Sequence, residues 1–198
     1  MPSASLPVLV SALLLCLVAA SRDSSLTYSL YKTIPTELHS DFKITYAPDY
    51  SFAVLYSPGT DFSPIFNPYG WTVYPNSDSY ELFNPITITA FLNPATNSSY
   101  LIYINDQFQV LLTEFTLADD HIEKLLYDGE GEDFCDRIVV SDDGSMWAMY
   151  CAVSGRLFVG NMEDTQQNAT VVKYKEGCEV MDLAWKPNSL TLVVATKN

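Results

Sequence analysis

Four segments of the chain share one pattern: an apolar run, a short polar turn, and a second run in which apolar and polar residues alternate. The turns are centred on Pro48, Pro94, Asp142 and Pro187, so successive units are spaced by 46, 48 and 45 residues. A period of about 40 to 50 residues is typical of propeller blades and of helical-repeat arrays. Because these runs are rich in β-branched and aromatic residues and alternate with period two, they indicate strands, and the repeat predicts a β-propeller.

The second and third units can each be divided into four strands, as in a propeller blade. The predicted strands are 85–91, 99–104, 108–115 and 121–127 in the second unit, and 137–141, 146–152, 156–160 and 169–174 in the third. One alternative concerns the last strand of the second unit. Ile122, Leu125 and Leu126 recur there at helical spacing, which favours a short helix.

The pattern predicts an all-β chain with about three complete four-stranded blades and a partial fourth, and a secreted β-sandwich is the alternative fold. The fourth unit contains two strands, which leaves an open edge available for self-association. The segment 26–34, LTYSLYKTI, alternates well enough to pair with the C-terminal hairpin and close a four-bladed ring. We therefore divide the chain into residues 1–20, an N-terminal segment 21–41 with this candidate closing strand, and a repeat domain 42–198.

The turn sequences resemble those of known propellers. Ser141–Ala148, SDDGSMWA, and Ala184–Ala195, AWKPNSLTLVVA, are similar to the turns between the first two strands of blades in WD40-like and TolB-like propellers. Tyr46–Val54, YAPDYSFAV, resembles the same turn in propeller domains of prolyl-oligopeptidase-type proteins. The resemblance implies a class of architecture, with interaction surfaces at the ends of a central channel, and points to no single family.

The N-terminus predicts entry into the secretory pathway. Val8–Ala19 is a twelve-residue apolar run followed by small residues, which is too short to span a bilayer and is typical of a cleaved signal peptide, residues 1–20. A membrane anchor is the alternative, and no later stretch predicts a transmembrane helix. Two N-glycosylation sequons begin at Asn97 and Asn168. Together these features predict a secreted or lumenal glycoprotein.

Three cysteines remain after removal of the signal peptide: Cys135, Cys151 and Cys178. Folding the chain at the turn 142–144 places Cys135 opposite Cys151 to within a residue, so we predict a disulfide between them. Cys178 stands before its apolar run as Cys135 does, and a bridge between neighbouring units is the alternative. An odd cysteine is also a candidate for joining another chain.

Net charge disfavours one class of partner, and motifs support no cofactor. The formal charge is −14, from 10 basic and 24 acidic residues, which disfavours nucleic-acid binding because that affinity rests on Lys and Arg. The acidic stretch 128–139 fails as an EF-hand, since Asp133 and Val139 stand where Gly and Glu are needed. No metal site, nucleotide-binding loop or serine-nucleophile motif is predicted.

Two functional hypotheses follow. The leading one is a non-catalytic module that binds a protein or glycan, with Tyr69 and Trp71 as candidate contacts in the aromatic tract 62–80, although this tract also fits a loop packed on the first blade. The alternative is a secreted carbohydrate-active hydrolase that uses carboxylates near the starts of inner strands. Those candidates are Asp41, Asp136 and Asp182. A third hypothesis is a fragment of a larger propeller.

Overall fold

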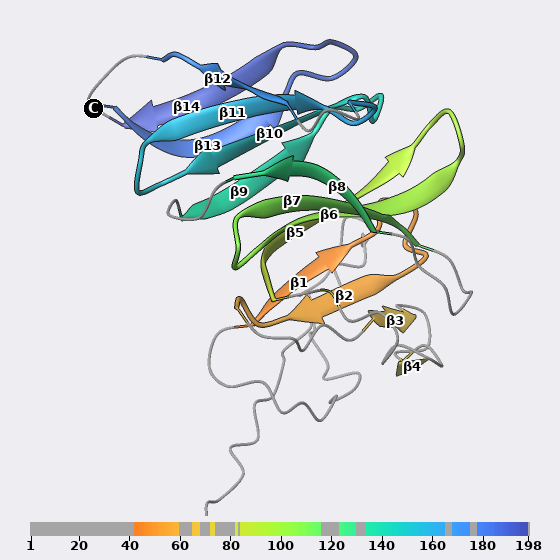
Figure 1. The fold of residues 1–198 in the computed structure, drawn as a ribbon. Helices are drawn as coiled ribbons and strands as arrows, with labels where there is room; N and C mark the ends of the chain where they lie inside the picture. The colour runs from red at the N-terminus through yellow and green to blue at the C-terminus, as the bar shows by residue number, and fades with distance from the viewer. Residues whose placement is uncertain are drawn as a thin grey trace, which may run out of the picture.

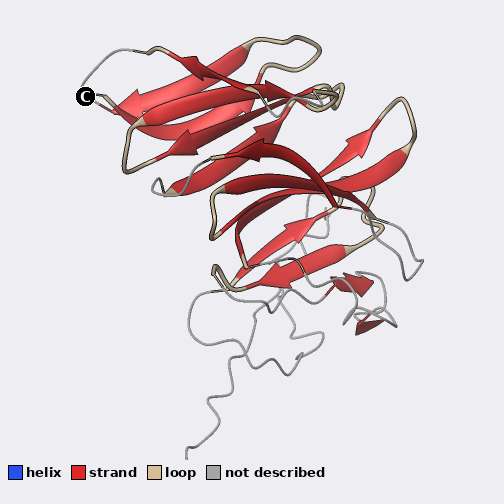
Figure 2. Cartoon of the chain, viewed as in Figure 1, coloured by secondary structure: helices blue, strands red, loops and turns tan. Residues whose placement is uncertain are grey.

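The computed structural model describes residues 42–59, 65–67, 72–73, 82, 84–115, 123–129, 134–164, 168–174 and 178–197. All regular structure in this part of the chain is β-strand, with no helix, which confirms the all-β prediction (Figure 2). Consequently none of these residues belongs to a helix long and apolar enough to cross a membrane. The predicted signal peptide 1–20 and the candidate closing strand 26–34 lie outside the described residues.

The strands form four antiparallel sheets, and each sheet is built from strands consecutive in the chain. Sheet A contains β1 (Lys43–Tyr46), β2 (Ala53–Tyr56), β3 (Ile65–Asn67) and β4 (Thr72–Val73). Sheet B contains β5 (Pro85–Asn93), β6 (Ser98–Asn105), β7 (Gln109–Glu114) and β8 (Glu123–Asp128). Sheet C contains β9 (Cys135–Val140), β10 (Met146–Cys151), β11 (Arg156–Asn161) and β12 (Ala169–Val172). Sheet D contains β13 (Glu179–Trp185) and β14 (Leu192–Lys197).

The eight strands predicted for the second and third units are all present, with ends within two residues of their predicted positions. The helix alternative for the last strand of the second unit is wrong, because β8 pairs antiparallel with β7. Its neighbour in the sheet, and not its local periodicity, decides its conformation. The aromatic tract 62–80 is not one continuous loop either, since β3 and β4 lie within it.

The turn between the first two strands of the third unit is held by its own side chains. The Asp143 carboxylate accepts hydrogen bonds from the Ser141 hydroxyl at 2.6 Å and from the backbone N–H and hydroxyl of Ser145 at 3.0 and 2.7 Å. These hydrogen bonds, first that of Ser141 and then those of Ser145, lower the pKa of Asp143. Gly144 adopts a positive φ of 70°, a conformation that glycine enters without strain. The motif quoted for the resemblance is thus a tight turn.

The first unit repeats this turn and ties it to the next sheet. Asp49 accepts hydrogen bonds from the backbone N–H and hydroxyl of Ser51 at 3.0 and 2.7 Å, and Tyr50 takes the positive φ of 58°. The hydroxyl of Ser99, on β6, donates to the other carboxylate oxygen at 3.2 Å. Burial raises the pKa of Asp49, but the hydrogen bonds of Ser51 and Ser99 outweigh burial and the pKa is lowered.

The four sheets pack face to face in chain order, as Figure 1 shows for the layers from β1–β2 through β5–β8 to β9–β14. One hydrophobic core lies between each pair of neighbouring sheets, so sheets B and C are covered on both faces. On β6, Leu101 and Tyr103 face sheet A, whereas Ile102 and Ile104 face sheet C. Burial on both faces explains why these strands read as continuous apolar runs in the sequence.

The first strands of successive units lie next to one another: β1 contacts β5, β5 contacts β9, and β9 contacts β13. Hydrogen bonds also link the sheets near these strands. Among them are bonds of 2.8 to 3.4 Å from Ile88 N to the Tyr56 hydroxyl, from the Thr89 hydroxyl to Ile138 O, from Arg137 Nη1 to Val180 O, and from Trp185 Nε1 to Val139 O. The described sheets therefore form a series of four layers with three separate cores, an arrangement different from two sheets that share one core.

Candidate functional site

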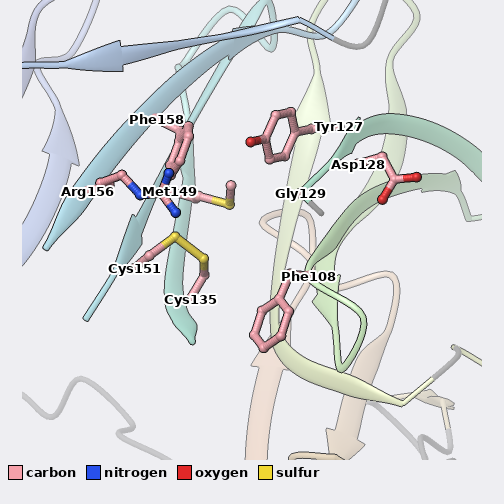
Figure 3. Close-up of a pocket in the computed structure, with 9 residues that line it drawn as sticks. All are labelled: Phe108, Tyr127, Asp128, Gly129, Cys135, Met149, Cys151, Arg156 and Phe158. Carbon is pink, nitrogen blue, oxygen red and sulfur yellow. A yellow bond between two sulfur atoms is a disulfide. The ribbon is translucent and has the colours of Figure 1, made fainter. Parts of the chain in front are cut away.

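A cleft of about 360 Å³ opens between sheets B and C (Figure 3). Its walls come from the second and third units of the repeat, which are consecutive along the chain. Sheet B supplies Phe108, Tyr127, Asp128 and Gly129, and sheet C supplies Cys135, Met149, Cys151, Arg156 and Phe158. A volume of this size falls in the range of about 300 to 1,000 Å³ that is usual for ligand sites.

The sheet B wall depends on a close approach between two chain segments. Phe108 stands in the turn between β6 and β7 with a positive φ of 61°, and its carbonyl accepts a hydrogen bond from Gly129 N at 3.3 Å. A Cβ atom on Gly129 would lie 2.9 Å from that carbonyl oxygen and 2.9 Å from the Tyr127 ring. Only glycine fits between these groups, so Gly129 keeps the Phe108 and Tyr127 rings on the same wall.

The sheet C wall pairs an aromatic ring with a cation. The guanidinium carbon of Arg156 lies 5.3 Å from the centroid of the Phe158 ring, within the range of a cation–π contact. Arg156 Nε also donates a hydrogen bond to the Ser154 hydroxyl at 3.1 Å. Across the cleft, the Tyr127 ring lies 5.5 Å from that of Phe158. Arg156 and Asp128 are exposed, so one positive and one negative side chain border an aromatic cleft.

The disulfide Cys135–Cys151 closes the side of the cleft beside Met149, as Figure 3 shows, and it confirms the predicted pairing. β9 and β10 pair in a regular register from Trp147 to Tyr150, and a register shift after Tyr150 then brings Cys151 opposite Cys135. Without that shift Cys151 would lie opposite Asp136. Cys135 and Cys151 are both buried, and the alternative bridge to Cys178 is not formed.

Of the carboxylates proposed for hydrolysis, the two that the structure describes do not line this cleft. Asp136 lies on β9, 3.9 Å from the Arg137 guanidinium, and its Oδ1 atom is buried with no hydrogen-bond partner among the described residues. Asp182 lies on β13, is exposed, and accepts a hydrogen bond from Leu183 N. Asp41 lies outside the described residues.

The remaining predicted site residues are placed as follows. Asn97 is exposed in the turn between β5 and β6, and Asn168 is exposed immediately before β12. Both acceptor asparagines are therefore accessible at the surface. The candidate ligand contacts Tyr69 and Trp71 lie outside the described residues.

The sequence analysis identified Cys135 and Cys151 as a disulfide but did not predict the cleft, because no local motif joins the residues that line it. One weak signal was present: Phe108 and Tyr127 stand at neighbouring ends of two predicted strands, and β7–β8 pairing brings those ends together. Among the residues that the structure describes, no group of three or more His, Cys, Asp or Glu is arranged to hold a metal ion. No protein-family model matches the chain, and no curated protein matches it.

Proposed function

We propose that the chain is a non-catalytic binding module with a β-propeller architecture, and that the cleft between sheets B and C is its ligand site. The architecture is supported by the repeated antiparallel sheets, their face-to-face packing, and the adjacency of the first strand of each unit. The observation that carries the function is the cleft itself, which is lined by three aromatic residues, two of them with rings in contact, and by one exposed cation and one exposed anion.

We favour a protein ligand over a glycan. Of the nine lining residues, Tyr127, Asp128 and Arg156 have polar side chains, and the surface that the lining exposes in the cleft is mainly polar. One exposed cation and one exposed anion border this surface, which suits a segment that carries charges of both signs. Protein side chains supply such charges, whereas neutral sugars do not. We therefore assign this cleft to a protein segment whose polar and charged groups contact Arg156 and Asp128.

Removing the aromatic or the cationic group should weaken this binding. The native chain is screened against a random peptide library and a glycan array, and any ligand recovered is titrated by calorimetry against Tyr127→Ala and Arg156→Ala. We expect peptide ligands whose affinity falls at least about tenfold in each variant, since contact residues of the Tyr and Arg type commonly dominate binding energy. Lys186→Ala is the matched control, because Lys186 is an exposed cation away from the cleft.

The outcome has three forms. Peptide binding lost in the two cleft variants and kept in Lys186→Ala supports the proposal. Binding to glycans alone replaces the protein ligand with a carbohydrate. Peptide binding that survives both cleft substitutions at native affinity places the ligand elsewhere on the molecule and contradicts the proposal.

We also propose that this module is a secreted or lumenal glycoprotein. The disulfide fits an oxidising compartment, where such bonds persist. Asn97 and Asn168 are both exposed, as glycan acceptors must be. The proposal rests on these two observations together with the apolar run near the N-terminus.

Expression of the full chain in a eukaryotic cell tests this route. Mass spectrometry of the medium should find a protein that begins at Ser21 and carries two N-linked glycans. Asn97→Gln and Asn168→Gln should each remove one glycan. Retention in the cytosol with an intact residue 1, or secretion without any glycan, would contradict the corresponding part of the proposal.

A further inference from the structure

The last strands of the sheets differ in how well their edges are protected against pairing with another strand. β8 carries the charged residues Glu123, Lys124 and Asp128, and β12 is only four residues long. β14 is six residues long, LVVATK, and its single charge is Lys197 at the end. Long apolar edges without charges are the ones that recruit further strands.

The backbone of β14 is paired on one side. In the part of the chain that the structure describes, β14 hydrogen-bonds to β13 alone, and sheet D has two strands where sheets A, B and C have four. The outward face beside this edge carries exposed apolar side chains: Val193 is 52% exposed, Met181 is 45% exposed, and Ala195 is exposed. The exposed carboxylate of Asp182, opposite Ala195, lies on the same face. Within the described residues, this unpaired edge and the largely apolar face beside it form one continuous surface.

We propose that β14 pairs antiparallel with β14 of a second copy of the chain, around a twofold axis perpendicular to the sheet. The two hairpins then form one four-stranded sheet of the same size as the others. The side chains of cross-strand partners lie on the same face of a sheet, so the axis must pass through a residue and not between two residues. Val194 and Ala195 are the two central residues of β14, so we place the axis at one of them. These two registers place Lys197 opposite Thr191 or Val193 of the copy, and no like charges face each other.

Local charge favours a second copy over a strongly charged partner. Within each hairpin, Lys197 and Glu179 are cross-strand partners, so charges of opposite sign lie side by side. The two β14 strands therefore meet as nearly neutral apolar strands, although each whole chain has a formal charge of −14. Because salt screens the long-range repulsion between the two acidic chains, the association should strengthen as ionic strength rises.

The test is sedimentation velocity of the full chain over a dilution series, comparing the native chain with the double variant Val193→Lys/Ala195→Lys. Both substitutions lie on the outward face of β14, opposite Ala184 and Asp182 of the same hairpin, so they should not disturb the fold. In either register they bring lysines of the two copies opposite each other. Like charges in such cross-strand pairs are destabilising, and we expect association weaker by about tenfold or more.

The matched control is Val153→Lys/Val171→Lys, which adds the same two charges at positions that are 75% and 49% exposed. A native chain and a control that dimerise, beside a β14 variant that remains monomeric with an unchanged melting temperature, support the proposal. It is overturned if the native chain is monomeric at every concentration, or if the β14 variant dimerises as the native chain does. A monomer whose β14 amides are protected from hydrogen exchange would show that a segment of the same chain covers the edge, which also overturns it.

Discussion

Replacing Gly160 with alanine should destabilise the protein by about 3 kcal/mol, because it overpacks a site that cannot yield. Gly160, on β11, is the cross-strand partner of Trp147 on β10, and the Trp147 side chain is fully buried. A Cβ atom on Gly160 would overlap the indole ring and would lie 2.6 Å from its Nε1 atom. The ring is fixed between sheets B and C and has no exposed direction in which to move.

Urea unfolding of Gly160→Ala and of the native chain measures the difference in the free energy of unfolding. In thermal unfolding, the melting temperature of Gly160→Ala should be lower by about 6 to 12 °C for a chain of this size. Gly59→Ala is the control: its Cβ meets no atom within 4 Å, but its φ is +75°. That variant should lose only the cost of a left-handed alanine, about 1 kcal/mol. Equal losses at the two positions would show that backbone conformation, and not the indole contact, explains Gly160.

A double-mutant cycle isolates the contact between the two residues. Trp147→Phe shortens the ring that meets Gly160, so adding Gly160→Ala to it should cost at least about 1 kcal/mol less than in the native chain. If the two losses simply add, the Cβ does not meet the indole and the packing argument is wrong.

The strands were predictable because their signals are local. The turn around Asp143 carries its own hydrogen-bond acceptors and a glycine with positive φ, so its sequence shows where one strand ends and the next begins. The pairing of Cys135 with Cys151 follows from that turn to within one residue, by counting residues along a hairpin. The register shift after Tyr150 does not follow from the sequence, yet it aligns the two cysteines.

The features that sequence reasoning missed depend on tertiary packing. Leu125 and Leu126 fit a helix as well as a strand, and pairing with β7 decides between the two. The cleft joins Phe108 and Tyr127 of one unit to Phe158 of the next, and these residues meet only when sheets B and C pack face to face. No spacing along the chain encodes that meeting.

Removing the disulfide should have a second large effect on stability. The Cys135–Cys151 bridge closes a loop with a sequence separation of 16 residues, for which the loss of chain entropy in the unfolded state stabilises the native state by about 3 kcal/mol. Cys135→Ala/Cys151→Ala should therefore melt about 6 to 12 °C lower than the native chain. Calorimetry of both proteins, under non-reducing conditions, measures the difference.

Two controls separate the bridge from the loss of sulfur atoms in the core. Adding a reductant should lower the melting temperature of the native chain toward that of the double variant, and should leave the double variant unchanged. Cys178→Ala, which removes a half-buried cysteine that does not belong to the bridge, should cost no more than about 1 kcal/mol, well below the cost of the double variant. If Cys178→Ala costs as much as the double variant, or if the reductant has no effect on the native chain, the bridge between β9 and β10 does not stabilise the fold. Because this bridge also lines the cleft, its loss should weaken binding there together with stability.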